Sequence, residues 1–301
     1  MLTVFSQVLI LILFSGAGFA LGKAGLVKNE HTTTLSRLLV YIFLPCNIIK
    51  TFWGNFTVAY IKTNYALLLA SLGAFGTVAV LSHFGGKLLS KESYEQKVCE
   101  YSLAIPNSGY MGYPIADNLL GRVAATSLLT FAIIPNFYIY TLGYWMLTKK
   151  SLSFKSLLNP AIISLVIGVL LGITGVPMPQ FATDLLETSS ACMAPTSMIL
   201  AGIVVSGFSF KTLLSQKKVY ILSVFRLLII PIAVGLALTP ICPNAATKTA
   251  VIYFAMPCGL NAVVFPRSIG ESCETGAAIA FVSTLASCVT IPIVFALFGI
   301  G

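Results

Sequence analysis

Two apolar segments carry proline, glycine and asparagine at positions where a membrane-spanning helix would need an unbroken backbone. The first runs from Tyr101 to Pro114, and the second runs from Tyr253 to Pro266. Proline and glycine interrupt helical hydrogen bonding, and the freed N–H and C=O groups need partners that lipid does not offer. A polar solute or an ion held between the segments would supply such partners. The pattern therefore indicates a binding site at membrane depth.

The two interrupted segments occupy corresponding places in the two halves of the chain. Pro257 follows Pro106 by 151 residues (257 − 106), and Pro266 follows Pro114 by 152 (266 − 114). Paired, interrupted helices in corresponding positions are the best sequence indicator of the binding site in a secondary transporter. We predict a substrate site formed by Pro106, Asn107, Ser108, Gly109, Tyr110, Pro257, Cys258, Gly259, Asn261, Asn47 and Asn136.

The predicted site suits an anion although it contains no formal cation. The N-terminal ends of the resumed helices carry unpaired N–H groups and a partial positive charge, which stabilise a negative group. Asn107, Ser108 and Asn261 add neutral donors and acceptors, and Tyr110 can wall an apolar body. A structural interpretation stays open, because glycines also permit close packing and buried amides also join helices. We expect a small organic anion such as a carboxylate, with no metal and no cofactor.

The composition predicts an all-α polytopic membrane protein. Hydrophobic residues make up 57% of the 301 residues and charged residues only 9%, against roughly a quarter in soluble proteins. The net charge of +9 is spread over short loops without an aromatic-interleaved patch, which argues against nucleic acid as a partner. Apolar runs predict ten transmembrane helices near residues 2–22, 30–53, 63–84, 96–119, 123–147, 157–177, 184–208, 217–239, 247–269 and 274–299.

Further landmarks recur at the same offset and predict an inverted repeat of five plus five helices. Gly172 follows Gly22 by 150 residues, and Pro195 follows Pro45 by 150. Because five is odd, the second half enters the membrane with the opposite polarity. We predict a first repeat over residues 1–148 and a second over 157–301, with the broken fourth and ninth helices as counterparts.

The basic residues predict the orientation. Arg226 lies inside a predicted span, thirteen of the eighteen lysines and arginines flank one face, and four flank the other: Lys50, Lys62, Arg122 and Lys248. The positive-inside rule makes the richer face cytoplasmic. We therefore expect a multi-pass protein of the cell (inner) membrane with both termini extracellular or periplasmic.

The run from Pro106 to Pro114, Pro-Asn-Ser-Gly-Tyr-Met-Gly-Tyr-Pro, resembles the signature of the auxin efflux carrier family. That family includes plant PIN-type auxin exporters and bacterial proteins described as malate or malonate permeases. The short central loop at 149–155 is similar to the bacterial branch. The resemblance extends along the chain through three further pairs: Leu44-Pro45, Asn159-Pro160 and Ile291-Pro292.

The resemblance implies the fold of sodium/proton antiporters and bile-acid symporters, in which the fourth and ninth helices cross near the midplane. Helices three to five and eight to ten form a moving core domain. Helices one, two, six and seven form a scaffold, which is often a homodimer interface. The implied mechanism is elevator-type alternating access, with a small organic anion, the lipid bilayer and a second copy of the chain as partners.

The coupling ion and two rival functions stay open. Bile-acid symporters place acidic residues near the crossing in the ninth helix, where this chain has Cys258, Gly259 and Asn261. Protons or the membrane potential are therefore favoured over Na⁺, with Glu100 as the candidate coupling residue. The alternatives are a sodium-coupled organic-anion symporter and a non-transporting receptor on the same fold. An enzyme is disfavoured, because the two histidines of the chain lie at the ends of spans.

Overall fold

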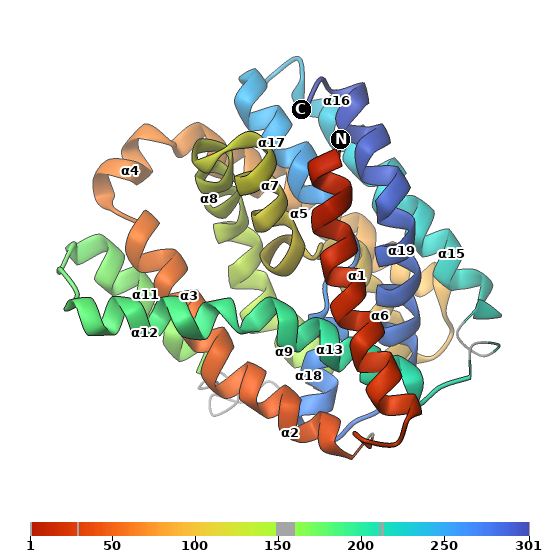
Figure 1. Cartoon of the computed structure of the whole chain (residues 1–301). Coiled ribbons are helices and arrows are strands. Elements are labelled where there is room, and N and C mark those ends of the chain that lie inside the picture. Colours follow the sequence, from red (N-terminus) through yellow and green to blue (C-terminus); the bar gives the residue numbers. More distant parts are fainter. Residues whose placement is uncertain (1, 29, 149–159, 210, 212–213, 301) are drawn as a thin grey trace.

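The computed structural model describes residues 2–28, 30–148, 160–209, 211 and 214–300, and these residues are nearly all helical (Figure 1). The helices of the first half are α1 (Leu2–Lys23), α2 (His31–Leu38), η1 (Leu39–Phe43), α3 (Leu44–Asn55), α4 (Val58–Thr63), α5 (Tyr65–Leu89), α6 (Ser93–Ala104), η2 (Ser108–Gly112), α7 (Tyr113–Leu120), α8 (Arg122–Tyr138), η3 (Ile139–Gly143) and α9 (Tyr144–Thr148). Those of the second half are α11 (Pro160–Thr174), α12 (Gln180–Ala191), α13 (Met193–Ser206), α15 (Lys217–Val224), η4 (Phe225–Ile229), α16 (Ile230–Leu238), α17 (Asn244–Ala255), α18 (Asn261–Ser268) and α19 (Glu274–Leu297).

Six helical segments among the described residues are long and apolar enough to cross a membrane: His31–Trp53, Tyr65–Leu89, Val123–Thr148, Gln180–Ser206, Lys217–Leu238 and Glu274–Leu297. Two shorter apolar helices cover Leu9–Lys23 and Pro160–Thr174. These segments confirm a polytopic α-helical membrane protein. The inverted repeat of ten helices stays a prediction, because the two interrupted segments consist of helices too short to span a membrane singly.

Prolines account for the interruptions and for the widened turns η1, η2 and η4, whereas η3 is not followed by a proline. α6 ends at Ala104, two residues before Pro106, and α17 ends at Ala255, two residues before Pro257. Proline lacks an N–H and clashes with the preceding turn, so the helix ends or widens there. Accordingly, the π-helical turns η1, η2 and η4 each end two residues before a proline, namely Pro45, Pro114 and Pro231.

The helices pack in two groups. In the first, α13 packs against the C-terminal half of α1, and α3 lies against α11 and α12 (Figure 1). Gly202 of α13 makes the closest approach between these helices, because a Cβ there would overlap the Ser15 carbonyl oxygen of α1. In the second group, α5 lies against α6 and α8, α16 against α17, and α15 against α19.

The beginning of α1 and the end of α19 lie at the same end of the molecule, the upper end in Figure 1. At the opposite end, α2 contacts α18. There the Arg37 Nε donates to the Ser268 carbonyl at 3.2 Å. Both ends of the described chain are therefore on one side, and the identity of that side stays a prediction.

Candidate functional site

The two interrupted segments meet at their breaks and hydrogen-bond to each other. The Asn107 N–H donates to the Pro257 carbonyl at 2.7 Å, and the Gly259 N–H donates to the Ile105 carbonyl at 3.0 Å. A Cβ at residue 259 would lie 3.2 Å from the Ile105 side chain, so glycine permits this close approach. From the sequence we expected a bound solute to satisfy the freed backbone groups. Instead, these four groups are satisfied by the opposite break, and the side chains are left to bind a solute.

A cavity of about 60 Å³ lies beside this pairing. It brings together eight of the eleven predicted site residues, from both halves of the chain: Pro106, Asn107, Ser108, Gly109, Gly259, Asn261, Asn47 and Asn136. Pro257 and Cys258 belong to the pairing and are not among the lining residues. The side chain of Tyr110 lies outside the described part of the structure.

Asn107 is the most unusual residue of the lining. It is 1% exposed, and neither atom of its side-chain amide has a hydrogen-bond partner among the described residues. An amide buried in this way costs about 1–3 kcal/mol, and native structures contain few such groups. Ser108 and Asn261, at 7% and 8% exposed, line the same cavity. Three polar side chains therefore converge where the breaks meet, and one of them has unused hydrogen-bonding capacity.

Helical spacing extends the site to two residues that the sequence analysis missed. Thr51 lies one turn after Asn47 on α3, and Tyr140 in η3 lies one turn after Asn136. Both line the cavity, and the Thr51 hydroxyl donates to the Asn47 carbonyl at 2.7 Å. Residues four apart share a helix face, so this spacing was the signal available in the sequence.

Glu100 lies apart from the cavity. Its Oε2 atom is 3.0 Å from Nδ1 of His83 on α5, whereas the Tyr138 hydroxyl of α8 donates to the Met146 sulfur at 3.5 Å. The Glu100 side chain is 15% exposed and is not among the lining residues. The coupling candidate therefore belongs to a separate polar pair that joins α5 and α6, and its role in coupling stays a prediction.

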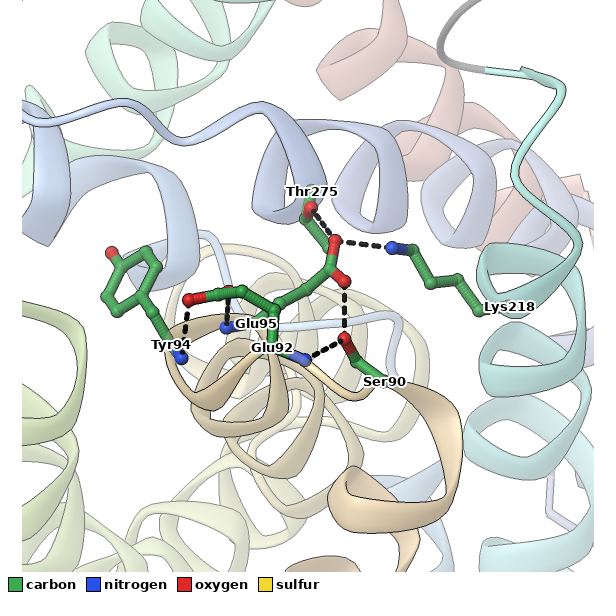
Figure 2. Close-up of polar contacts among 6 residues, drawn as sticks. All are labelled: Ser90, Glu92, Tyr94, Glu95, Lys218 and Thr275. Carbon is green, nitrogen blue, oxygen red and sulfur yellow. Dashed lines mark hydrogen bonds and ion pairs between the residues drawn. The ribbon is translucent and has the colours of Figure 1, made fainter.

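A second polar group joins three helices on the side predicted to be cytoplasmic, as Figure 2 shows. Glu95 of α6 accepts hydrogen bonds from Ser90 at 2.5 Å and from Thr275 at 2.7 Å, and it pairs with Lys218 of α15. The Glu92 carboxylate caps α6 by accepting from two N–H groups of its first turn, at 2.6 and 3.0 Å. Burial raises the pKa of Glu95, but the hydrogen bonds from Lys218, Ser90 and Thr275 outweigh it and hold the pKa below its ordinary value.

The cavity itself is neutral. Its described lining contains no carboxylate, and the described residues hold no group of three or more His, Cys, Asp or Glu side chains that could bind a metal ion. Amides, hydroxyls and aliphatic side chains form the wall. An anion in this cavity would therefore meet hydrogen-bond donors without meeting a like charge.

Comparison with known proteins agrees with this architecture. A family described as "Membrane transport protein" matches residues 3–155 and 149–295. The uncharacterised transporter YfdV of Escherichia coli K12 is 21% identical over 97% of both chains. An uncharacterised transporter of Methanothermobacter thermautotrophicus is 23% identical over 95% of both chains. One of Methanocaldococcus jannaschii is 23% identical over 68% of this chain and 70% of its own.

The two matched ranges together cover nearly the whole chain, and the relatives carry transporter names rather than enzyme names. The helical architecture and its membrane-length apolar segments agree with a transporter in a lipid bilayer. The chain is a multi-pass membrane protein that belongs to the membrane transport protein family, the auxin efflux carrier family.

Proposed function

We propose that this protein is a secondary active transporter for a small organic anion, which binds through its carboxylate in the cavity where the two breaks meet. The observation that carries the proposal is the Asn107 amide, which is buried beside the cavity and has no hydrogen-bond partner among the described residues. A carboxylate accepts hydrogen bonds from an amide NH₂ group, and such charge-assisted bonds are the strong ones. Binding would therefore satisfy a donor that the protein itself leaves unused.

The volume of the cavity supports a small ligand or a small head group. A cavity of about 60 Å³ has room for a few water-sized groups, which suits a carboxylate better than a whole indole acid. Gly109 is exposed and lines the cavity, so the site is accessible beside the first break. Leu44, Leu128 and Met193 provide an apolar wall for the body of the substrate.

The lining also supports alternating access between two groups of helices. Asn47 and Thr51 come from α3 and Met193 from α13, in the proposed scaffold. Asn107 and Asn261 come from the interrupted segments, in the proposed core. A site at the boundary between two rigid units is exposed to opposite sides when one unit moves past the other. We propose that spans three to five and eight to ten form the moving core of a five-plus-five inverted repeat.

The neutral lining favours coupling to protons or to the membrane potential. Na⁺ is a hard cation that prefers oxygen ligands and negative charge, and the described lining offers no carboxylate. Glu100, paired with His83, is the carboxylate to test for proton coupling. Replacing Na⁺ by K⁺ at fixed pH and voltage should leave transport nearly unchanged. A strict Na⁺ requirement would instead support the sodium-coupled symporter.

Flux through purified protein in liposomes tests the proposed function. Radiolabelled malonate, malate and indole-3-acetate would be offered to protein-containing and empty liposomes. Saturable uptake of at least one of them, with counterflow against an internal unlabelled pool, is the expected result. Binding without flux would indicate a receptor, and flux without counterflow would indicate a channel. Either outcome would overturn the proposal.

A further inference from the structure

Arg226 is the only charged side chain among the described residues that is buried, and it is 0% exposed. It lies in η4, the π-helical turn that ends two residues before Pro231. A buried charge is expensive unless it is paired, and an ionisable side chain within a membrane span is a functional candidate by default. The contacts of Arg226 therefore indicate whether its charge has a structural or a functional role.

The guanidinium of Arg226 has little compensation inside the protein. One terminal nitrogen donates to the Leu103 carbonyl at 2.9 Å, and the guanidinium carbon lies 5.6 Å from the centre of the Phe254 ring. Its Nε and its other terminal nitrogen have no hydrogen-bond partner within the described chain. No carboxylate of the described residues lies within 4 Å of it. A carbonyl dipole and a ring face are thus the neighbours of a full positive charge.

Both neighbours of Arg226 belong to the ends of helices that lead into the breaks. Leu103 immediately precedes Ala104, where α6 ends, and Phe254 immediately precedes Ala255, where α17 ends. The cavity lining begins at Ile105, two residues after Leu103, and continues to Gly109. Because two residues span at most about 7 Å and a guanidinium nitrogen lies 2.9 Å from the Leu103 carbonyl oxygen, the guanidinium lies within about 10–15 Å of the cavity wall, and Arg226 is not among the residues that line it. The charge therefore sits behind the crossing, outside contact with the cavity but within electrostatic range of it.

We infer that Arg226 is a specificity-determining residue, which selects anions by giving the cavity a positive electrostatic potential. It acts through space and does not touch the ligand. At this distance, and with an effective dielectric constant near 20, the attraction between the guanidinium and a monoanion raises the binding constant of the anion by about five- to fifteenfold. A bound monoanion compensates for the guanidinium, so the occupied site is close to neutral. The inference deepens the proposed function, because it names the source of the preference for anions.

The potential can be measured without knowing the substrate. Gly109 lines the cavity, is exposed, and has open space where a Cβ would be added. A Gly109→Cys variant, with the seven native cysteines replaced, would be labelled in liposomes with an anionic and with a cationic methanethiosulfonate of similar size. Asn244→Cys, at an exposed position on α17, supplies the reference ratio of the two rates.

With Arg226 in place, the ratio of anionic to cationic labelling at residue 109 should exceed the reference by at least tenfold. Arg226→Gln should lower this ratio at least tenfold, and Arg226→Lys should restore most of it. A residue that only caps α6 would leave the ratio unchanged. A ratio near the reference in the Arg226 protein would overturn the inference even where the glutamine variant fails to fold. If the wild-type protein shows no flux while the labelling ratio at residue 109 stays high, the proposed function is refuted and the inference about Arg226 is not.

Discussion

Replacing Asn107 by leucine separates a binding role from a packing role. Leucine has the same branched shape as asparagine but lacks the two amide atoms, which have no partner among the described residues. Asn107 is 1% exposed, so the substitution removes an amide whose burial costs about 1–3 kcal/mol. We expect the substrate-free variant to be at least as stable as the wild type, with an unfolding midpoint in detergent that is equal or a few degrees higher.

The same substitution should weaken ligand binding. A hydrogen bond to a charged group contributes about 1.5–3 kcal/mol, which corresponds to roughly 10- to 150-fold in affinity. The assay is thermal unfolding of the purified protein with and without the carboxylate that proves to be transported, together with its half-saturation concentration in liposomes. The shift of the midpoint by ligand should fall in Asn107→Leu.

Asn261→Leu is the matched control. Asn261 lines the same cavity and is similarly buried, but it already interacts with another group of the protein. Leucine there should lower the stability of the substrate-free protein, because an existing interaction is lost. If Asn107→Leu instead lowered stability and left the affinity unchanged, the Asn107 amide would be a packing element and the reasoning would be refuted.

Three further predictions concern the surroundings of the site. Because hydrogen bonds hold the pKa of Glu95 below its ordinary value, its contribution to stability should be present above its unfolded-state pKa of about 4.3 and be lost as pH falls through the lower folded-state value. Unfolding midpoints from pH 3 to 7 should show this loss in the wild type and a smaller one in Glu95→Gln. Gly202→Ala should destabilise the protein by about 1–3 kcal/mol, because the added Cβ overlaps the backbone of α1, whereas Gly16→Ala, which meets nothing within 4 Å, should not. Equal midpoints for the two alanine variants would contradict the close approach of the helices. A membrane-impermeant thiol reagent applied outside cells should label a cysteine at residue 244 and miss one at Ser215, and the reverse pattern would invert the predicted orientation.

Local features of the fold were predictable from the sequence. The missing N–H of proline is a property of one residue, so Pro106 and Pro257 were sufficient to predict where α6 and α17 end. Similarly, the apolar composition predicted membrane helices, because lipid excludes charged side chains and unpaired backbone groups. The residue types at the breaks also predicted which asparagines would line a shared cavity.

Contacts between distant segments were not predictable in the same way. The hydrogen bond from Asn107 to Pro257 depends on how two segments dock that are 150 residues apart (257 − 107). The contact of Glu100 with His83 depends on the packing of α6 against α5. Arg226 could be recognised as an ionisable residue within a span, but its position behind both helix ends required the tertiary structure.

The mutual backbone pairing of the two breaks has a consequence for biosynthesis. The residues around Pro106 are made well before their partners around Pro257, and 151 residues (257 − 106) separate them. At a synthesis rate of about 5–20 residues per second, roughly 8 to 30 s pass during which the first break has no second break to pair with. During that interval its open backbone groups need shelter from lipid, which an insertion machinery or retained water can supply. The second half of the chain thus completes the folding of the first, and a ribosome that stalls between the two would leave an interrupted helix exposed in the bilayer.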